Sequence, residues 1–184
     1  MKILMRSEEM ARTLERLAYQ IMEKHPSAEN CILLGIQRRG ADLAARLAGI
    51  LSERLGGPVA LGSLDINLYR DDWTSRSVAP AVGRSEIPGS VEGKHVLLVD
   101  DVLFTGRTVR AALEAIADYG RPRTVELLVL VDRGHRELPI QADYVGMKIA
   151  TARSEKVNVC VTGHDGRDEV CLLKEGEDQA GISK

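Results

Sequence analysis

Hydrophobic residues in the first third of the chain alternate between helical and strand spacing. Apolar residues recur every three or four positions between Ser7 and Pro26, which predicts a helix that Ser7 caps and Pro26 ends. Residues 31–34 (CILL) form an unbroken apolar run, which predicts the first buried strand. A second helix follows and ends at residues 56–58 (GGP). The predicted core positions of the two helices are Met10, Leu14, Leu17, Ala18, Ile21, Leu43, Leu47, Ile50 and Leu51.

The same alternation continues through the rest of the chain. The further elements are a long strand over residues 59–69, a long polar loop over 70–90, a buried strand over 96–99, a helix with an apolar face at Val109, Ala112, Leu113 and Ile116, a buried strand over 125–131, and weaker strands over 157–161 and 170–173. Strands that alternate with helices predict an α/β fold, in which helices flank a twisted, mainly parallel sheet.

The composition fits one globular domain. A chain of 184 residues buries one sizeable core, so we expect a single domain over residues 1–184. The net charge of −2 gives no overall attraction to nucleic acid or to anionic membranes. Charge interrupts residues 1–9 before a signal-peptide core forms, and no later apolar run is long enough to span a bilayer, which predicts a cytoplasmic protein without a membrane partner. The three cysteines and four histidines lack metal-ligand spacing, so we expect buried thiols and no metal held directly by the protein.

The strand at residues 96–99 leads into the most informative segment of the chain. Asp100 and Asp101 follow it directly, at the strand end where open α/β sheets bind ligands. Residues 105–108 (TGRT) then open a helix, so backbone N–H groups and hydroxyls gather at a helix N-terminus that suits an anion. Two carboxylates beside a phosphate site favour a sugar phosphate, whose hydroxyls or bound cation would meet the acids.

Three other segments place charge beside predicted strands. Residues 35–40 (GIQRRG) follow a buried strand and combine two glycines with Arg38 and Arg39, which suits a diphosphate or, equally, a solvated surface turn. Tyr69 and Arg70 open the long polar loop, which predicts either a mobile flap or an ordinary solvated charge cluster. Residues 131–140 (VDRGHRELPI) are unusually dense in charge directly after another buried strand.

Residues 96–108 resemble the phosphoribosyl-pyrophosphate (PRPP) motif of type I phosphoribosyltransferases. Phospho-receiver domains also have a strand that ends in Asp-Asp, but there it is the first strand and no Thr-Gly-x-Thr turn follows. The run at 131–140, together with residues 35–40 and 65–72, narrows the resemblance to the PyrR family of pyrimidine-operon attenuation regulators with uracil phosphoribosyltransferase activity. Hypoxanthine, adenine and orotate enzymes do not share that run.

The resemblance implies a type I phosphoribosyltransferase-like fold with a core over about residues 7–161, a flexible loop at 70–90 and a small hood at 133–150. It implies that uracil and PRPP give UMP and pyrophosphate, with Mg²⁺ bound through PRPP, and that the protein is a homo-oligomer. Asp100 and Asp101 would be catalytic, Tyr69 and Arg70 would belong to the flexible loop, and Arg133 and Val157 would border uracil. The implied PRPP and nucleotide-binding residues are Arg38, Arg39, Asp100, Asp101, Val102, Leu103, Phe104, Thr105, Gly106, Arg107 and Thr108.

PyrR relatives also bind leader mRNA of the pyrimidine operon, more tightly with UMP or UTP. The candidate RNA contacts carried over from this resemblance are Arg12, Arg16, Arg136 and Lys148. The chain departs from the family pattern at Glu15, Tyr19, Gln141 and Met147, where positive or polar groups are lost. An enzyme that also regulates by attenuation is therefore the main hypothesis, and a uracil salvage enzyme without RNA binding is the alternative. A purine salvage enzyme would share the central motif but would leave the 131–140 run unexplained.

Overall fold

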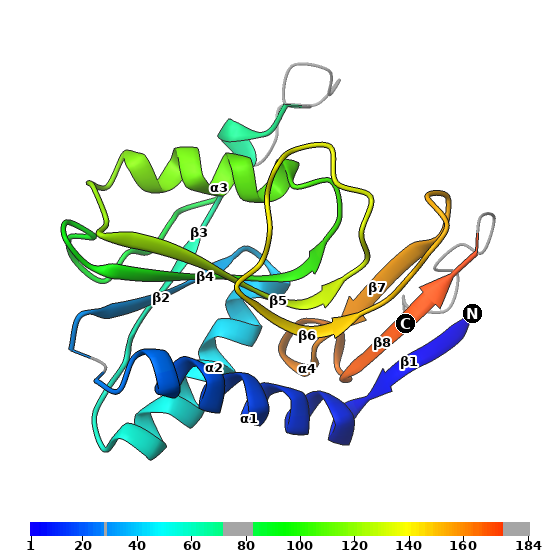
Figure 1. Ribbon diagram of the computed structural model, residues 1–184, viewed down its shortest axis with the longest axis horizontal. Helices are drawn as coiled ribbons and strands as arrows, with labels where there is room; N and C mark the ends of the chain where they lie inside the picture. The colour runs from blue at the N-terminus through cyan, green and yellow to red at the C-terminus, as the bar shows by residue number, and fades with distance from the viewer. Residues whose placement is uncertain (28, 72–82, 175–184) are drawn as a thin grey trace.

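The chain forms two β-sheets that lie beside each other (Figure 1). The computed structural model describes residues 1–27, 29–71 and 83–174. In that part of the chain, a five-stranded parallel sheet has the order β3-β2-β4-β5-β6, and a three-stranded antiparallel sheet has the order β1-β8-β7. The strands are β1 (Lys2–Arg6), β2 (Cys31–Ile36), β3 (Ala60–Leu64), β4 (His95–Leu103), β5 (Thr124–Asp132), β6 (Tyr144–Lys148), β7 (Lys156–Cys160) and β8 (Glu169–Leu173).

Helices cover both faces of the parallel sheet, as the sequence predicts. In Figure 1, α1 (Ser7–Lys24) and α2 (Arg39–Leu55) lie below the sheet and α3 (Arg107–Ala117) lies above it. Alternate residues of β4 pack into hydrophobic clusters on opposite faces of the sheet. Leu97 packs into the cluster that includes α1 and α2, and Leu98 packs into the cluster that includes α3. A short helix α4 (Thr162–Asp165) joins β7 to β8, and a 3₁₀ turn η1 (Asn67–Tyr69) follows β3.

Most of the predicted core positions are confirmed. The five predicted in α1 are all buried, and so are Leu43, Leu47 and Leu51 in α2, although Ile50 is only half-buried. In α3 the prediction for Leu113 is wrong, because that side chain is 42% exposed and Ala111 is buried in its place. The three cysteines are buried, as expected.

The long strand predicted over residues 59–69 is wrong in its second half. The strand β3 ends at Leu64, where the Asp65 carboxylate accepts a hydrogen bond from the backbone N–H of Asn67 at 2.8 Å. Tyr69 N–H then donates to the carbonyl of Ile66 at 2.9 Å. These local bonds replace the strand ladder and turn the chain into η1.

The hydrophobic pattern does not predict two strands, β1 and β6, because each buries only one of its five residues, Met5 in β1 and Tyr144 in β6. The strand β1 precedes the predicted first strand and pairs with β8, so both ends of the described chain contribute to the second sheet. The strand β6 lies inside the segment predicted as a hood, but it pairs with β5 as an edge of the parallel sheet. The second sheet, β1-β8-β7, is not anticipated by the predicted parallel architecture.

Most of the polar loop predicted over residues 70–90 lies outside the described residues. The structure describes only its two ends, Arg70 and Asp71 at the start and residues 83–90 at the end. At the second end, Glu86 forms an isolated antiparallel bridge with Ser63 of β3. None of the helices in the described segments has the length and apolar character that crossing a bilayer requires.

Candidate functional site

Two adjoining cavities lie at the carboxyl ends of β2 and β4. The first cavity, of about 370 Å³, is lined by Arg70, Asp71, Asp100 and residues 102–109. The second, of about 400 Å³, is lined by residues 36–40, 65–67, 100–102, Arg70, Thr108 and His164. Both cavities include Arg70, Asp100, Val102 and Thr108, so the acidic segment at the end of β4 separates them and faces both.

The acidic pair is mostly enclosed by protein. Burial raises the pKa of Asp100 well above its usual range, and the neighbouring charge of Asp101 adds to this rise. Burial also raises the pKa of Asp101, against the opposing effects of a backbone hydrogen bond from Val102 and the charge of Arg39. Each carboxylate accepts one backbone N–H, that of Asp101 at 2.9 Å for Asp100 and that of Val102 at 2.8 Å for Asp101. Buried carboxylates of this kind are stabilised by ligand hydroxyls that donate to their remaining lone pairs.

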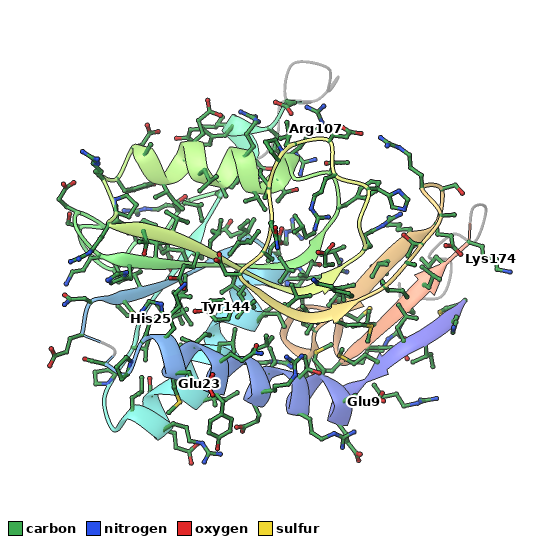
Figure 2. All side chains as sticks on the ribbon, viewed as in Figure 1. Glu9, Glu23, His25, Arg107, Tyr144 and Lys174 are labelled. Carbon is green, nitrogen blue, oxygen red and sulfur yellow. The ribbon has the colours of Figure 1, made fainter. Side chains whose placement is uncertain are left out.

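The 105–108 turn forms the wall of the first cavity and opens α3. Gly106 has φ +92°, a left-handed conformation that glycine adopts without strain. The Arg107 side chain, labelled at the start of α3 in Figure 2, contacts the Asp71 and Glu137 carboxylates at 2.8 Å each. The Arg107 side chain is thus paired with carboxylates, and the whole turn lines the first cavity, where its backbone and hydroxyls suit a bound phosphate.

The turn over residues 35–40 depends on two glycines that allow close approach of the backbone. A Cβ atom on Gly35 would lie 2.3 Å from Ala41 Cα, and one on Gly40 would lie 2.5 Å from the carbonyl oxygen of Val99. The second contact brings the start of α2 against β4, directly before the acidic pair. Arg38 and Arg39 therefore line the second cavity beside Asp100 and Asp101.

The two arginines of this turn have different partners. Arg39 forms a two-pronged ion pair with Asp165 of α4, with N–O distances of 3.0 and 2.9 Å. This pair raises the pKa of Arg39 and lowers that of Asp165. Arg38 instead contacts the His164 ring at 3.5 Å. Arg38 has no carboxylate partner within the described segments, so its charge is available to an anion.

The entrance to the long loop is fixed against α3. Arg110 donates to the carbonyl of Tyr69 at 2.7 Å and pairs with Asp71 at 2.7 Å. The Tyr69 hydroxyl donates to Asp118, and this bond raises the pKa of Tyr69 to about 12. These contacts hold the backbone on each side of Arg70, which lines both cavities.

Arg133 lies behind Phe104, outside both sets of lining residues. Its guanidinium carbon is 4.0 Å from the centre of the Phe104 ring, and its Nη2 donates to the carbonyl of Ala152 at 3.0 Å. Burial lowers the pKa of Arg133. Val157 is buried in β7 and also lies outside the cavity lining. Phe104 itself lines the first cavity, so it presents a flat apolar face there.

Comparison with known proteins agrees with this geometry. The phosphoribosyl transferase domain family matches residues 2–166. The chain is 52% identical over 166 residues to the bifunctional protein PyrR of Pelotomaculum thermopropionicum, covering 90% of this chain and 92% of that protein. It is 49% identical over 173 residues to the bifunctional protein PyrR of Chloroflexus aurantiacus, covering 94% and 95%. The chain belongs to the PyrR family of phosphoribosyltransferases.

Solved structures confirm the fold of this PyrR family member. A hypoxanthine phosphoribosyltransferase of Trypanosoma cruzi superimposes with a TM-score of 0.71 at 22% identity, covering 95% of this chain and 97% of that one. The same enzyme in complex with its product IMP gives a TM-score of 0.72 at 22% identity, covering 94% of each chain. The predicted type I phosphoribosyltransferase fold is confirmed.

The RNA contacts predicted from the PyrR resemblance are spread over different surroundings. Arg12 is 71% exposed, and Arg16 reaches from α1 to β6, where it donates to the carbonyl of Gly146 at 2.6 Å. Lys148 is exposed at the end of β6. Arg136 is folded inward, because it pairs with Asp132 at 2.6 Å and donates to the carbonyl of Phe104 at 2.9 Å. Arg12, Arg16 and Lys148 therefore belong to two elements that pack together, α1 and β6, whereas Arg136 holds the backbone at Leu103 and Phe104, which line the first cavity.

Two residues of the PyrR site have no assigned role in the sequence analysis. Asp65 is 7% exposed, lines the second cavity, and keeps its Oδ2 without a hydrogen-bond partner in the described structure. The position of Asp65 at the carboxyl end of a parallel strand, where such sheets bind ligands, could have indicated this role. His164 also lines this cavity, but it comes from α4, distant in sequence, and no local pattern indicates its position.

The residues of this site fit a Mg²⁺ ion that enters with its ligand. Asp65, Asp100 and Asp101 offer carboxylate oxygens to the second cavity, and the buried Oδ2 of Asp65 is an unused acceptor. Among the residues that the structure describes, no group of three or more His, Cys, Asp or Glu is arranged to hold a metal directly. Mg²⁺ prefers oxygen ligands and keeps several waters, to which such carboxylates provide acceptors.

Proposed function

We propose that this protein transfers the phosphoribosyl group of PRPP to uracil, forming UMP and pyrophosphate, and that it regulates a pyrimidine operon through its leader mRNA. The observation that carries the enzymatic proposal is the position of Asp100 between two cavities. One cavity has a phosphate turn and an aromatic face, and the other has a cationic turn. This arrangement matches a ribose with a 5′-phosphate on one side and a diphosphate on the other.

In this proposal, the ribose hydroxyls bind Asp100 and Asp101, and the 5′-phosphate binds residues 105–108. The diphosphate is placed on the second cavity beside Arg38, with Arg70 at the junction of the two cavities. Mg²⁺, when bound with PRPP, neutralises charge on the diphosphate, and Asp65, Asp100 and Asp101 would hold its waters. Fixing both anionic ends of PRPP positions C1 of the ribose for attack and stabilises the charge that develops on the leaving group.

The uracil end of the site is placed against Phe104. The Phe104 ring lines the first cavity, and Arg133 supports it from behind at 4.0 Å. Arg133 also organises the backbone near Ala152, which leads into β7 and Val157. A planar base is recognised by such a ring through stacking and by neighbouring backbone groups through hydrogen bonds. Arg133 and Val157 therefore act as supports for the uracil wall in this proposal.

The enzymatic proposal is tested by product formation from radiolabelled bases. Uracil, hypoxanthine, adenine and orotate are each incubated with PRPP, Mg²⁺ and the purified protein. We expect UMP from uracil and no nucleotide from the other three. Conversion of hypoxanthine with no conversion of uracil would contradict the proposal and favour purine salvage.

The regulatory proposal rests on the likeness to the bifunctional PyrR proteins and on the exposed charges of α1 and β6. Titration of the leader RNA from the protein's own operon, with and without UMP, tests it. We expect UMP to tighten binding, with an affinity that falls steeply as salt rises. Binding that ignores UMP, or no binding, would leave a salvage enzyme. A cytoplasmic location and a homo-oligomeric assembly belong to the same proposal.

A further inference from the structure

His164 brings a titratable ring to the second cavity from a distant part of the chain. It lies in α4, between two strands of the antiparallel sheet, whereas the rest of the cavity comes from β2, β3, β4 and their turns. The His164 ring is exposed, and its Nε2 is 3.5 Å from Nη1 of Arg38. A guanidinium can only donate, so the Nε2 of His164 is the acceptor in this contact.

The position of α4 is fixed by a set of contacts that we call the α2–α4 clamp. Arg39 pairs with Asp165 at 2.9 Å, and Arg46 pairs with Asp168 at 2.6 Å. These two carboxylates also accept the backbone N–H groups at the start of the turn, those of Val161 and Thr162, at 2.9 and 2.7 Å. Gly163, next to His164, packs so closely that a Cβ atom there would lie 2.8 Å from Asp42 Oδ1. His164 is therefore held at the cavity by a rigid turn, although its own ring is exposed.

The charge in this cavity is low for a diphosphate. The clamp compensates the charge of Arg39 with Asp165, and three carboxylates (Asp65, Asp100 and Asp101) line the same space. Arg38 is the guanidinium of the 35–40 turn without a carboxylate partner in the described residues. A further positive charge beside Arg38 would strengthen binding of a polyanion.

We propose that His164 is a further ligand of the diphosphate and that it takes up a proton when the diphosphate binds. This inference rests on the proposed function and deepens it. The anion attracts the Arg38 guanidinium away from Nε2, the freed Nε2 takes a proton from solvent, and the resulting imidazolium donates to a diphosphate oxygen. The charged groups around the ring are Arg38, Arg39 and Asp42 at the start of α2, Asp165 in its own turn, and Asp101 at the end of β4.

Calorimetric titration with magnesium diphosphate tests the inference. Titrations between pH 6 and pH 8, in pairs of buffers with different ionisation enthalpies, give both the affinity and the number of protons taken up. The wild-type protein is compared with His164→Gln, and with His95→Gln as a control at the opposite end of β4. We expect His164→Gln to bind about tenfold more weakly at pH 6, to approach wild type at pH 8, and to lose the proton uptake.

The outcomes separate a diphosphate ligand from a structural support. Weaker binding with unchanged proton uptake would show that His164 only orients Arg38, and would overturn the inference. Equal affinity and uptake in the wild type and His164→Gln would also overturn it. If the expected pattern is found in a protein that makes no UMP, the inference is supported and the uracil proposal fails. If UMP forms but the variant matches wild type, the inference fails and the uracil proposal stands. Absence of diphosphate binding by the wild type would contradict both.

Discussion

The acidic pair destabilises the fold, because two neighbouring carboxylates are kept from water, yet the proposed site requires both of them. Asp101 is half-buried beside the buried Asp100, and burial raises the pKa of both carboxyl groups. Asp101→Asn removes one of these charges and keeps the side-chain shape. We expect kcat/KM for PRPP to fall by about 10- to 100-fold, because a hydrogen bond to a charged acceptor is lost. Thermal unfolding should occur at an equal or higher temperature, since the substitution relieves like-charge repulsion.

Steady-state kinetics and thermal unfolding measured on the same preparation check this prediction. Glu114→Gln, a change at an exposed carboxylate on α3, is the control and should leave both unchanged. Normal PRPP kinetics in Asp101→Asn would contradict the ribose assignment.

Glu126 makes the opposite contribution, because its charge stabilises the fold. Burial disfavours its ionisation, but hydrogen bonds from Lys24, His25 and Tyr144 outweigh burial and lower its pKa to about 2. Figure 2 shows His25 and Tyr144 near each other between the end of α1 and the parallel sheet. The Glu126 pKa is lowered on folding, so the stabilisation is present above the ordinary value and is lost as the pH falls from about 4.5 to about 2.

We therefore expect Glu126→Gln to reduce the free energy of unfolding at pH 7 by up to about 3 kcal/mol. The difference from wild type should shrink as the pH falls through that window. Urea denaturation between pH 2 and pH 7 measures it. A difference that does not change with pH would show that packing, not charge, accounts for the loss.

At the residue scale, the sequence predicts those parts of the site that are local in the chain. Asp100, Asp101 and residues 105–108 follow one another directly, so their shared location follows from the strand and the turn. Asp65 and His164 meet that segment only through tertiary packing. The inward orientation of the Arg136 side chain could not be predicted from the sequence either. Its partners are mainly backbone carbonyls, which every residue has, so no residue type indicates them.

At the scale of elements, the α2–α4 clamp joins the two sheets through paired charges. The ion pair with Arg46 lowers the pKa of Asp168, so its stabilisation is present above the ordinary carboxyl range near pH 4 and is lost as the pH falls below it. Asp168→Asn should lower the free energy of unfolding at pH 7 by about 1–3 kcal/mol. It should also weaken diphosphate binding, because α4 carries His164.

Chemical denaturation at pH 7 and pH 3 checks the stability effect, which should be larger at pH 7. Glu8→Gln is a matched control, because its ion pair with Arg12 is on the surface with side chains 91% and 71% exposed. Equal stability of Asp168→Asn and wild type at pH 7 would contradict a stabilising role for the clamp.

Element prediction succeeds where an element buries several residues in a regular pattern and fails where it buries only one. The helix α1 and strands β4 and β5 each bury a long regular pattern, and the sequence places them correctly. The strands β1 and β6 bury one residue each, and the pairing of β1 with β8 joins the two ends of the described chain. A hydrogen bond from the Asn67 N–H to the Asp65 carboxylate ends β3 early, and the spacing of hydrophobic residues does not indicate such a bond.

At the scale of the whole molecule, the proposed RNA surface combines two elements that pack together, α1 and β6. Gly146 of β6 allows this close packing, because a Cβ atom there would lie 2.9 Å from Thr13 Cγ2. Arg16 crosses the same contact to reach the Gly146 carbonyl at 2.6 Å. Gln141 is exposed in the segment before β6, and Met147 is half-buried within β6. The double substitution Gln141→Arg and Met147→Lys adds two positive charges to this region.

We expect the double variant to bind leader RNA more tightly and to show a steeper dependence of affinity on salt, because each added phosphate contact releases a counterion. Filter binding at several salt concentrations measures both. The variant Leu113→Lys and Ala117→Lys, at two exposed positions of α3, adds the same two charges elsewhere and is the control. Unchanged affinity and salt dependence in the double variant would mean that RNA binds another face.

The central claim is that one nucleotide spans the 105–108 turn, the acidic pair and the Phe104 ring. A crystal structure of the protein with UMP tests this most directly. We predict the 5′-phosphate on residues 105–108, the ribose hydroxyls on Asp100 and Asp101, and the uracil ring against Phe104. A phosphate bound at the 35–40 turn, or a base placed away from Phe104, would contradict the account.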